Sequence, residues 1–456
     1  MTKHLITALS ILTLLCSCTV YERYSRPEET RVENIFREEA TLSDTAITAP
    51  VPWRELFRDS QLQALIDTGL ANNSDLRIAT LRVEQAEAAL SASRLAYLPE
   101  VSLTPQGTVS SYAGGKAAKT YSLGLSAAWE TDIAGQITNG KRNAMATLQQ
   151  QRSYRQAVSA QLVATIANTY YNLMALDRQM DISARSLHSW DEIIRTLEAF
   201  SKVGGANGAA VAQAKASRHE VESGILSLSL QQRTMENSLC TLLGWTPRTI
   251  SRGDLESQTF PDSLASGVPL RLIENRPDVR QAEYALQAAY YSVNRARAAF
   301  YPSLTLSGAI GWTNSGGAAI VNPGEWLMNA LGALVQPVFS RGRNTANVRI
   351  AEAQRQEALV NFRQKLLEAG EEVNSALAQW QSARQRLEVS GRRIGALEDA
   401  VRSTRLLMTH SGGSSYLEVL TAQQSLLAAQ QEETAQTLEM IQGMIKLYHA
   451  IGGSRE

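Results

Sequence analysis

The residue types that most often carry enzyme chemistry are sparse and scattered along this chain of 456 residues. No two of its histidines have the spacing of paired metal ligands; they are His4, His188, His219, His410 and His449. The sequence also lacks the glycine-rich loops that cradle phosphates or dinucleotides. Because an enzyme needs converging acids, bases, nucleophiles or metals, we predict that the chain is not an enzyme and holds no cofactor or metal.

One cysteine near the start does have neighbours that specify a chemistry. Residues 5–15 form an apolar stretch that follows Lys3 and is too short to span a bilayer, as in an export signal. The run Leu-Cys-Ser-Cys that ends at Cys18 resembles the bacterial lipobox, in which a small residue precedes the cysteine that is cleaved and acylated. We therefore predict a lipoprotein signal peptide at residues 1–17 and lipidation of Cys18. The alternative is an ordinary signal peptide cut nearby, beside an incidental cysteine.

The charge balance and the remaining cysteine exclude several kinds of partner and linkage. The chain has 44 Lys and Arg against 44 Asp and Glu, which gives no electrostatic case for a nucleic-acid partner. An acylated Cys18 leaves Cys240 without a disulfide partner, and the apolar neighbours of Cys240 predict a core thiol. No later segment has about 18 consecutive apolar residues, so we expect no transmembrane helix in the mature chain. A membrane crossing would then require a closed β-barrel.

The sequence contains an internal repetition that spans most of its length. Asp75 and Arg77 correspond to Asp278 and Arg280 at an offset of 203 residues, and this offset grows slowly to 208 further along. Such a pattern is hard to obtain by chance, so we interpret the chain as two similar halves. Further matching pairs are Arg94 with Arg297, Pro99 with Pro302, Gly135 with Gly342, Arg142 with Arg349, Gly204 with Gly412 and Gly244 with Gly452. The expected parts are the signal peptide, a lipid-anchored extension at 18–59, the halves at 60–244 and 267–453, a linker at 245–266 and a tail at 454–456.

Each half contains two short segments that are typical of a β-hairpin. Alternation with a period of two is clear in 121–129 and again in 304–312. It is weaker in 101–111 and 327–339, which we predict to be the partner strands because strands of membrane barrels give weak signals of about ten residues each. The residues that share one face are Tyr121, Leu123, Leu125, Ala127 and Trp129 in one segment, and Leu304, Leu306, Gly308, Ile310 and Trp312 in the other.

Helices are predicted on both sides of the strands in each half. A shorter helix begins near Asn72 and again at Pro277, and a long helix follows the strands. Residues 141–203 contain neither Pro nor Gly, and a helix of this length extends roughly 95 Å. Each long helix leads to a glycine pair, at 204–205 or 412–413, and then to a return helix, which predicts two antiparallel helical hairpins. Apolar steps of four and three, as in a coiled coil, mark Leu162, Ile166, Thr169, Leu173, Leu176, Met180, Ser183, Leu187, Trp190, Ile194 and Leu197, and then Leu366, Ala369, Val373, Ala376, Trp380, Ala383, Leu387, Ser390, Ile394, Leu397 and Val401.

The predicted strands are too few to seal one chain in a membrane. Known membrane barrels need at least about eight strands, and an open sheet edge cannot remain exposed in lipid. Other copies of the chain must therefore complete the sheet. Two copies would supply eight strands, three would supply twelve and four sixteen, and the strand number alone leaves this choice open.

Four motifs extend across the mature chain, namely NRPDVRQAE at 275–283, ARAAFYPSL at 296–304, WRELF at 53–57 and SYLEVL at 415–420. They resemble those of the TolC-like outer-membrane efflux proteins, in particular the lipoprotein branch that serves resistance-nodulation-division (RND) pumps. The resemblance implies an α+β membrane protein with two internal structural repeats. It implies a homotrimer in which four strands per chain form a β-barrel that continues into a long antiparallel α-helical barrel in the periplasm. It also implies a lipid-anchored channel in the cell outer membrane, with a periplasmic adaptor protein and an inner-membrane pump as partners.

The resemblance also gives roles to the hairpin tips, which in the family meet the adaptor and close the periplasmic end. The matching turns contain Gly204, Gly205, Gly412 and Gly413, although these glycines could serve only the left-handed backbone of a tight turn. Family members often carry acidic residues near the tip, but Thr421 stands where a carboxylate is often found. Glu418 is the nearest acid and is the candidate for the aperture, with an ordinary solvated position as the equal alternative.

The preferred function is the outer-membrane channel of a tripartite efflux system that conducts drugs, metal ions or other small molecules. A lipid-anchored periplasmic coiled-coil adaptor or scaffold would have similar helices, but it would not need four alternating segments. A type I protein-secretion conduit would share the channel fold. No motif in the sequence specifies the exported compound.

Overall fold

The structure is a computed structural model in which the described residues are 23–28, 52–111, 117–203, 207–259, 273, 275–313, 325–410 and 416–453. The chain divides into two compact units. Unit 1 consists of residues 1–31, 81–153 and 280–364, and unit 2 consists of residues 32–80, 154–279 and 365–456. Each unit therefore takes residues from both of the similar halves expected from the sequence.

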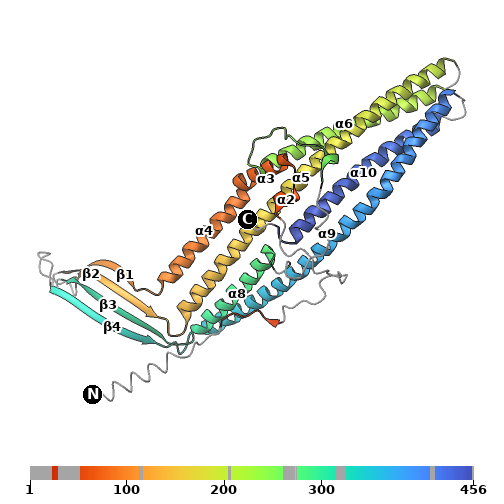
Figure 1. The fold of residues 1–456 in the computed structure, drawn as a ribbon. Coiled ribbons are helices and arrows are strands. Elements are labelled where there is room, and N and C mark those ends of the chain that lie inside the picture. Colours follow the sequence, from red (N-terminus) through yellow and green to blue (C-terminus); the bar gives the residue numbers. More distant parts are fainter. Residues whose placement is uncertain are drawn as a thin grey trace. The chain divides into compact units, whose positions relative to one another are not determined.

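The strands of unit 1 form one antiparallel sheet in the order β1-β2-β3-β4 (Figure 1). They are β1 (Glu100–Ser110), β2 (Ala118–Thr131), β3 (Ser303–Thr313) and β4 (Glu325–Val335). All four predicted strands are thus confirmed. The predicted end of the last one at Phe339 was wrong, because β4 stops at Val335. Pro337, which lacks a backbone N–H, follows, and the side chain of Gln336 instead donates to the carbonyl of Phe300 at 2.9 Å.

A shorter helix precedes each pair of strands, namely α4 (Ser74–Leu95) and α8 (Pro277–Ala298). The side-chain oxygen of Asn73 accepts the backbone N–H groups of Asp75 and Leu76 at 3.0 and 3.1 Å, which satisfies donors that have no partner inside α4. The other helix begins at Pro277, as expected from the fixed φ angle and missing N–H of proline.

The long helices are α5 (Gln136–Lys202, 67 residues) and α9 (Arg343–His410, 68 residues). The first begins earlier than predicted because the carboxylate of Asp132 accepts the N–H groups of Ile137 and Thr138, each at 2.8 Å. The backbone enters both helices through glycines with positive φ, Gly135 at 72° and Gly342 at 77°.

The return helices are α6 (Gly208–Leu242) and α10 (Tyr416–Ala450). In unit 2 they pack beside α5 and α9, and α6 also contacts α10 (Figure 1). Every residue of the two predicted apolar seams is buried or half-buried, so the coiled-coil spacing is confirmed. Within the described residues, no helix combines enough length with enough apolar character to cross a membrane.

Short elements complete the core of unit 2, namely α2 (Trp53–Leu56), α3 (Ser60–Asn72) and the 3-10 helix η2 (Leu255–Ser257). Phe57, which follows α2, is fully buried and lies edge-on to Tyr448 with ring centroids 6.0 Å apart. The hydroxyl of Tyr170 donates to the carboxylate of Asp59 at 2.8 Å. This polar contact ties the segment around α3 to α5.

Candidate functional site

The sheet of unit 1 has one apolar face and one polar face, because alternate residues of a strand point to opposite sides. Its register places Leu103, Leu125 and Ile310 side by side across three strands. The apolar face also holds Val101, Val109, Leu123, Trp129, Leu306, Trp312, Trp326, Met328 and Leu334. The opposite face holds Ser102, Thr104, Gln106, Thr108, Thr120, Ser122, Ser126, Thr305, Ser307 and Asn329, together with the apolar Leu331 and Val335 of the edge strand β4.

The apolar face is open to its surroundings in one chain. Leu103 is 64% exposed and Met328 is 77% exposed, although each lies in the middle of its strand. Burial of such side chains stabilises a fold by roughly 1.5–3 kcal/mol each. The face therefore fits an apolar medium and not water.

Both edges of the sheet are also open, because within the described residues β1 and β4 each have a neighbouring strand on one side only. An edge strand presents unpaired N–H and C=O groups that can pair with another strand. The edges are long, with 11 residues in each of the two strands. Together with the apolar face, they predict that further strands join the sheet.

Aromatic side chains lie near both ends of the apolar face. At the loop end, Trp312 packs against Trp326 with ring centroids 4.7 Å apart. At the helix end, the indole N–H of Trp129 donates to the carbonyl of Tyr97 at 2.9 Å. Aromatic rings with a polar edge concentrate at the two interfaces of a membrane, so this spacing fits a sheet that spans one.

In unit 2 the ends of α5, α6 and α10 near the predicted tips meet in a small apolar cluster around Trp190. The Trp190 ring is fully buried, and its indole N–H has no hydrogen-bond partner among the described residues. The other members are Ile193, Ile194, Leu197, Ala210, Ala214, Val419 and Leu420. Trp190 was already placed in the seam by its spacing, but nothing in the sequence marked it as the centre of a cluster from three helices.

One cation connects three helices close to this cluster. Arg405 of α9 donates to the carboxylate of Glu192 on α5 and to the side-chain oxygen of Gln423 on α10, each at 3.3 Å. Neither Arg405 nor Glu192 was predicted from the sequence. They are 213 positions apart, and only the packing of the two hairpins brings them together.

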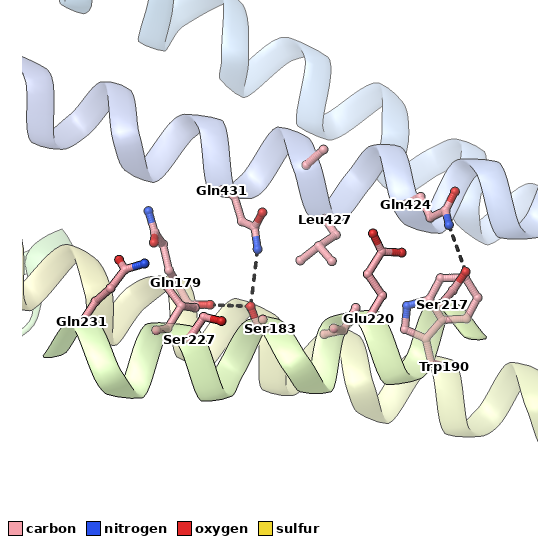
Figure 2. A pocket seen from close by; sticks show the side chains of 14 residues that line it. Gln179, Ser183, Trp190, Ser217, Glu220, Ser227, Gln231, Gln424, Leu427 and Gln431 are labelled. Carbon is pink, nitrogen blue, oxygen red and sulfur yellow. Dashed lines mark hydrogen bonds between the residues drawn. The ribbon is translucent and has the colours of Figure 1, made fainter. Parts of the chain in front are cut away.

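Neutral side chains also form hydrogen bonds between the two hairpins. A groove of about 550 Å³ runs between α5, α6 and α10 and includes Trp190 among its lining residues (Figure 2). Across it, the amide of Gln431 donates to Ser183 at 3.4 Å, and that of Gln424 donates to Ser217 at 3.0 Å. Neutral hydrogen bonds of this kind contribute only about 0.5–1.5 kcal/mol each, so this contact can rearrange at modest cost.

The sequence-predicted site residues are only partly covered by the structure. Cys18 and the tip glycines Gly204, Gly205, Gly412 and Gly413 lie outside the described residues. Glu418 is exposed in the first turn of α10, directly before the buried Val419 and Leu420. Within the described residues, no group of three His, Cys, Asp or Glu side chains could hold a metal ion.

A buried ionic cluster lies away from the tips, where α8 begins. The guanidinium of Arg276 is 2% exposed and donates to Asp278, to Glu372 at 2.6 Å and to the carbonyl of Ala450 at 2.9 Å. Burial by itself would raise the pKa of Asp278, but the hydrogen bonds and charge of Arg276 lower it below its usual value. Burial, with the same guanidinium, lowers the pKa of His449.

A second buried cation forms ion pairs elsewhere in unit 2. The side chain of Arg252 is 8% exposed and pairs with Asp177 and with Glu236, the latter at 2.7 Å. Both clusters join segments that are far apart in sequence. We therefore assign them a structural role.

The chain is similar to known proteins over nearly its whole length. The model of the family described as outer membrane efflux protein matches residues 65–245 and 268–453. Cation efflux system protein CusC of Escherichia coli (strain K12) is 31% identical over 451 residues, which cover 96% of this chain and 97% of CusC. The probable outer membrane lipoprotein SilC of Salmonella typhimurium is 28% identical over 467 residues and 99% of each chain. The solved structure of the outer-membrane channel OprN superposes with a TM-score of 0.87 at 25% identity, over 96% of this chain and 99% of OprN.

Proposed function

This chain belongs to the outer membrane efflux protein family, and from that premise we propose that three copies assemble into one channel wall. The protein is the outer-membrane channel of an efflux system. The single observation that supports the assembly is the sheet of unit 1, which has two unpaired edges, one apolar face and one polar face. Three copies would join β4 of one chain to β1 of the next and form a twelve-stranded β-barrel, which leaves no edge in lipid.

The two faces then have separate roles in the assembled wall. Leu103 and Met328 would face lipid, and Ser102 and its neighbours on the polar face would line the water-filled interior. The interior side chains of β1, β2 and β3 are mainly hydroxyls and amides, and the charged residues among them, Glu100 and Glu130, lie at the helix end of the strands. Because the wall is uncharged along most of its length, we propose that this region passes small solutes of several kinds.

The assembly is tested by the mass of the purified mature protein in detergent. We expect the mass of three chains and a band on an unheated gel that shifts on boiling, because a closed barrel resists detergent until it is heated. A monomer that stays in solution without detergent would contradict the proposal. It would favour the lipid-anchored adaptor or scaffold instead, for which the apolar sheet face has no use.

The exported compound is proposed from the relatives. CusC is named as part of a cation efflux system, and the relative ArpC of Pseudomonas putida as the outer membrane protein of an antibiotic efflux pump. We propose that this channel serves metal cations or small organic compounds, delivered by an inner-membrane pump through a periplasmic adaptor. A deletion strain should become sensitive to copper, dyes, bile salts or antibiotics and recover with the gene restored. Loss of a secreted protein alone would favour the type I secretion conduit.

The ends of the two hairpins are proposed as an adjustable aperture that meets the adaptor. The support is the combination of one ion pair, Arg405 with Glu192, and weak neutral bonds across the groove of Figure 2. The turns at 204–205 and 412–413 are the proposed adaptor contacts, and Glu418 is the proposed acidic group at the opening.

The aperture is tested by single-channel conductance in planar bilayers. Arg405→Ala removes an ion pair between the hairpins and should raise the open conductance, whereas Arg402→Ala, whose ion pair with Asp399 stays within α9, is the matched control. Glu418→Ala should lower the preference for cations over anions. An unchanged conductance and selectivity in Glu418→Ala would remove this residue from the aperture.

Lipidation and internal repetition complete the proposal. We propose that Cys18 carries the lipid anchor, which mass spectrometry of the mature N-terminus would test. We also propose that 60–244 and 267–453 are structural repeats, joined by the linker at 245–266. Support comes from matching contacts, because Asn73 donates to the carbonyl of Leu242 at 3.0 Å and Arg276 donates to that of Ala450 at 2.9 Å. In each half, the residue before the shorter helix thus binds the end of the return helix.

A further inference from the structure

Three cations line a pocket of unit 1 where its helices meet its strands. The pocket has a volume of about 470 Å³ and lies between α4, α5 and α8. Its cations are Arg94 near the end of α4, and Lys141 and Arg142 near the start of α5. Among the described residues, no carboxylate lies within ion-pair distance of any of the three. The other lining residues are Met145, Ala146, Gln149, Gln287 and Tyr291.

Aromatic rings hold two of these cations without neutralising them. The ammonium of Lys141 is 4.9 Å from the ring centroid of Tyr97, and the guanidinium carbon of Arg142 is 5.8 Å from that of Tyr291. Cation–π contacts orient a charged group, but they leave its full charge available to an anion. The three groups therefore form a preformed positive site with room for a ligand.

The corresponding place in the second half has a carboxylate that this pocket lacks. By the sequence offsets of 203 and 207, Arg94 corresponds to Arg297, and Met145 corresponds to Glu352. Arg297 and Glu352 form an ion pair at 2.6 Å. The first half thus keeps the cation and has a thioether where its carboxylate would stand. Arg94 therefore lacks the ion pair that Arg297 makes.

The surroundings of the pocket indicate a membrane interface. Tyr97 also accepts a hydrogen bond from Trp129, which lies on the apolar face of the sheet, and such rings gather at the level of lipid headgroups. The backbone N–H of Tyr24 donates to the hydroxyl of the lining residue Tyr291 at 3.5 Å. Cys18 precedes Tyr24 by six residues, a span of at most about 20 Å. A lipid on Cys18 would therefore be tethered within about that distance of Tyr24.

We propose that this pocket binds the phosphate of an anionic phospholipid from the leaflet that holds the Cys18 lipid. Arg and Lys donate charge-assisted hydrogen bonds to phosphate oxygens, and the Met145 thioether offers an apolar surface to the glycerol region. The charge of unit 1 favours such a ligand, since its described residues include sixteen Lys and Arg against ten Asp and Glu. The inference rests on the outer-membrane location and not on which compound the channel exports.

The decisive variant restores the missing carboxylate. Met145→Glu would pair with Arg94 as Glu352 does with Arg297, while Met145→Gln has the same size without the charge. The full mature protein in detergent would be titrated with phosphatidylglycerol, with phosphatidylcholine of the same acyl chains, and with inorganic phosphate, and bound lipid would be counted by native mass spectrometry. A second control, Arg297→Gln, removes the cation of the corresponding ion pair in the second half.

The wild type should bind phosphatidylglycerol about tenfold more tightly than phosphatidylcholine, because the choline ammonium of phosphatidylcholine offsets its phosphate charge and is repelled by the three cations. The preference should fall to near unity in Met145→Glu and in the double variant Arg94→Gln with Arg142→Gln. It should persist in Met145→Gln and Arg297→Gln, with the oligomer intact in all of them. Equal binding of the two lipids by the wild type, or an unchanged preference in Met145→Glu, would overturn the proposal. Inorganic phosphate that displaces phosphatidylglycerol at equal concentration would assign the pocket to a free anion instead.

Discussion

Apolar side chains are exposed on the sheet of unit 1 but buried in the core of unit 2. In unit 2, Phe57, Ile166 and Trp190 are fully buried by residues of the same chain. In the sheet, Leu103 is 64% exposed and Met328 is 77% exposed. Unit 2 therefore supplies its own core, whereas the sheet depends on lipid and on further copies of the chain. The difference separates what one chain can stabilise alone from what only the assembly and the membrane can stabilise.

The largest expected effect comes from a charge on the apolar face. Leu103→Arg should prevent stable insertion, because an arginine on the lipid face of a barrel costs about 2–4 kcal/mol per chain at the bilayer midplane. Thr104→Arg, on the neighbouring position of the opposite face, should insert and assemble normally. Folding into vesicles, followed by protease protection, measures both. Equal loss in the two variants would break the distinction between the faces.

The next effect tests the buried cluster of unit 2. Arg276→Ala should destabilise unit 2 by about 3–5 kcal/mol, because it removes charge-assisted hydrogen bonds to the half-buried Asp278 and to the buried Ala450 carbonyl, each of which contributes roughly 1.5–3 kcal/mol. Asn73→Ala, at the matching position of the first half, removes a neutral cap and should cost about 1 kcal/mol. Hydrogen exchange of the α10 and α6 ends would report each loss. A larger effect for Asn73→Ala would contradict this ranking.

A pair of substitutions at Trp190 tests whether the cluster near the tips is held by packing. Trp190→Ala should cost about 3–5 kcal/mol through the cavity it leaves. Trp190→Phe should cost less, because the buried indole N–H has no described partner to lose. Thermal unfolding and protease sensitivity of the α5–α6 hairpin would measure both. Similar losses in the two variants would mean that the indole N–H has a partner after all.

The smallest expected effect is a pH dependence at His449. Its pKa in the folded chain is lowered, so the unfolded chain takes up its proton first as pH falls below about 6.5. The stability that His449 contributes is therefore present above pH 6.5 and declines below it. In His449→Gln, the melting temperature should change less between about pH 7 and pH 5. An identical slope in both proteins would remove His449 from the acid response.

Much of the architecture could be predicted because it follows from local periodicity. Alternation around Leu125 and Ile310 identified the strands and their shared face, and steps of four and three around Ile166 identified the buried seam of α5. The end of β4 was missed because the apolar sequence continues through Val338 to Phe339, while Pro337 interrupts the strand. The hydrophobic pattern by itself does not show that Pro337 lacks the backbone N–H that a continuing strand would need.

The candidate site was less predictable. Glu418 was proposed from a resemblance, whereas Arg405 and Glu192 carried no signal, because many exposed helices hold Arg and Glu at similar spacing. The lack of an ion pair at Arg94 was not predicted from the sequence either. Its sequence match with Arg297 suggested equal surroundings, and only the neighbouring helix revealed Met145 in place of a carboxylate.

The sequence by itself determined which residues form strands and helices and which face of each is apolar, because these properties depend on neighbours within a few positions. Tertiary structure alone decided which faces meet. It joined Arg276 to Glu372 across 96 positions and Arg405 to Glu192 across 213, and it left three cations around one pocket, with no acid beside them among the described residues. Charges so far apart along the chain interact appreciably only after packing has brought them within a few ångströms of each other.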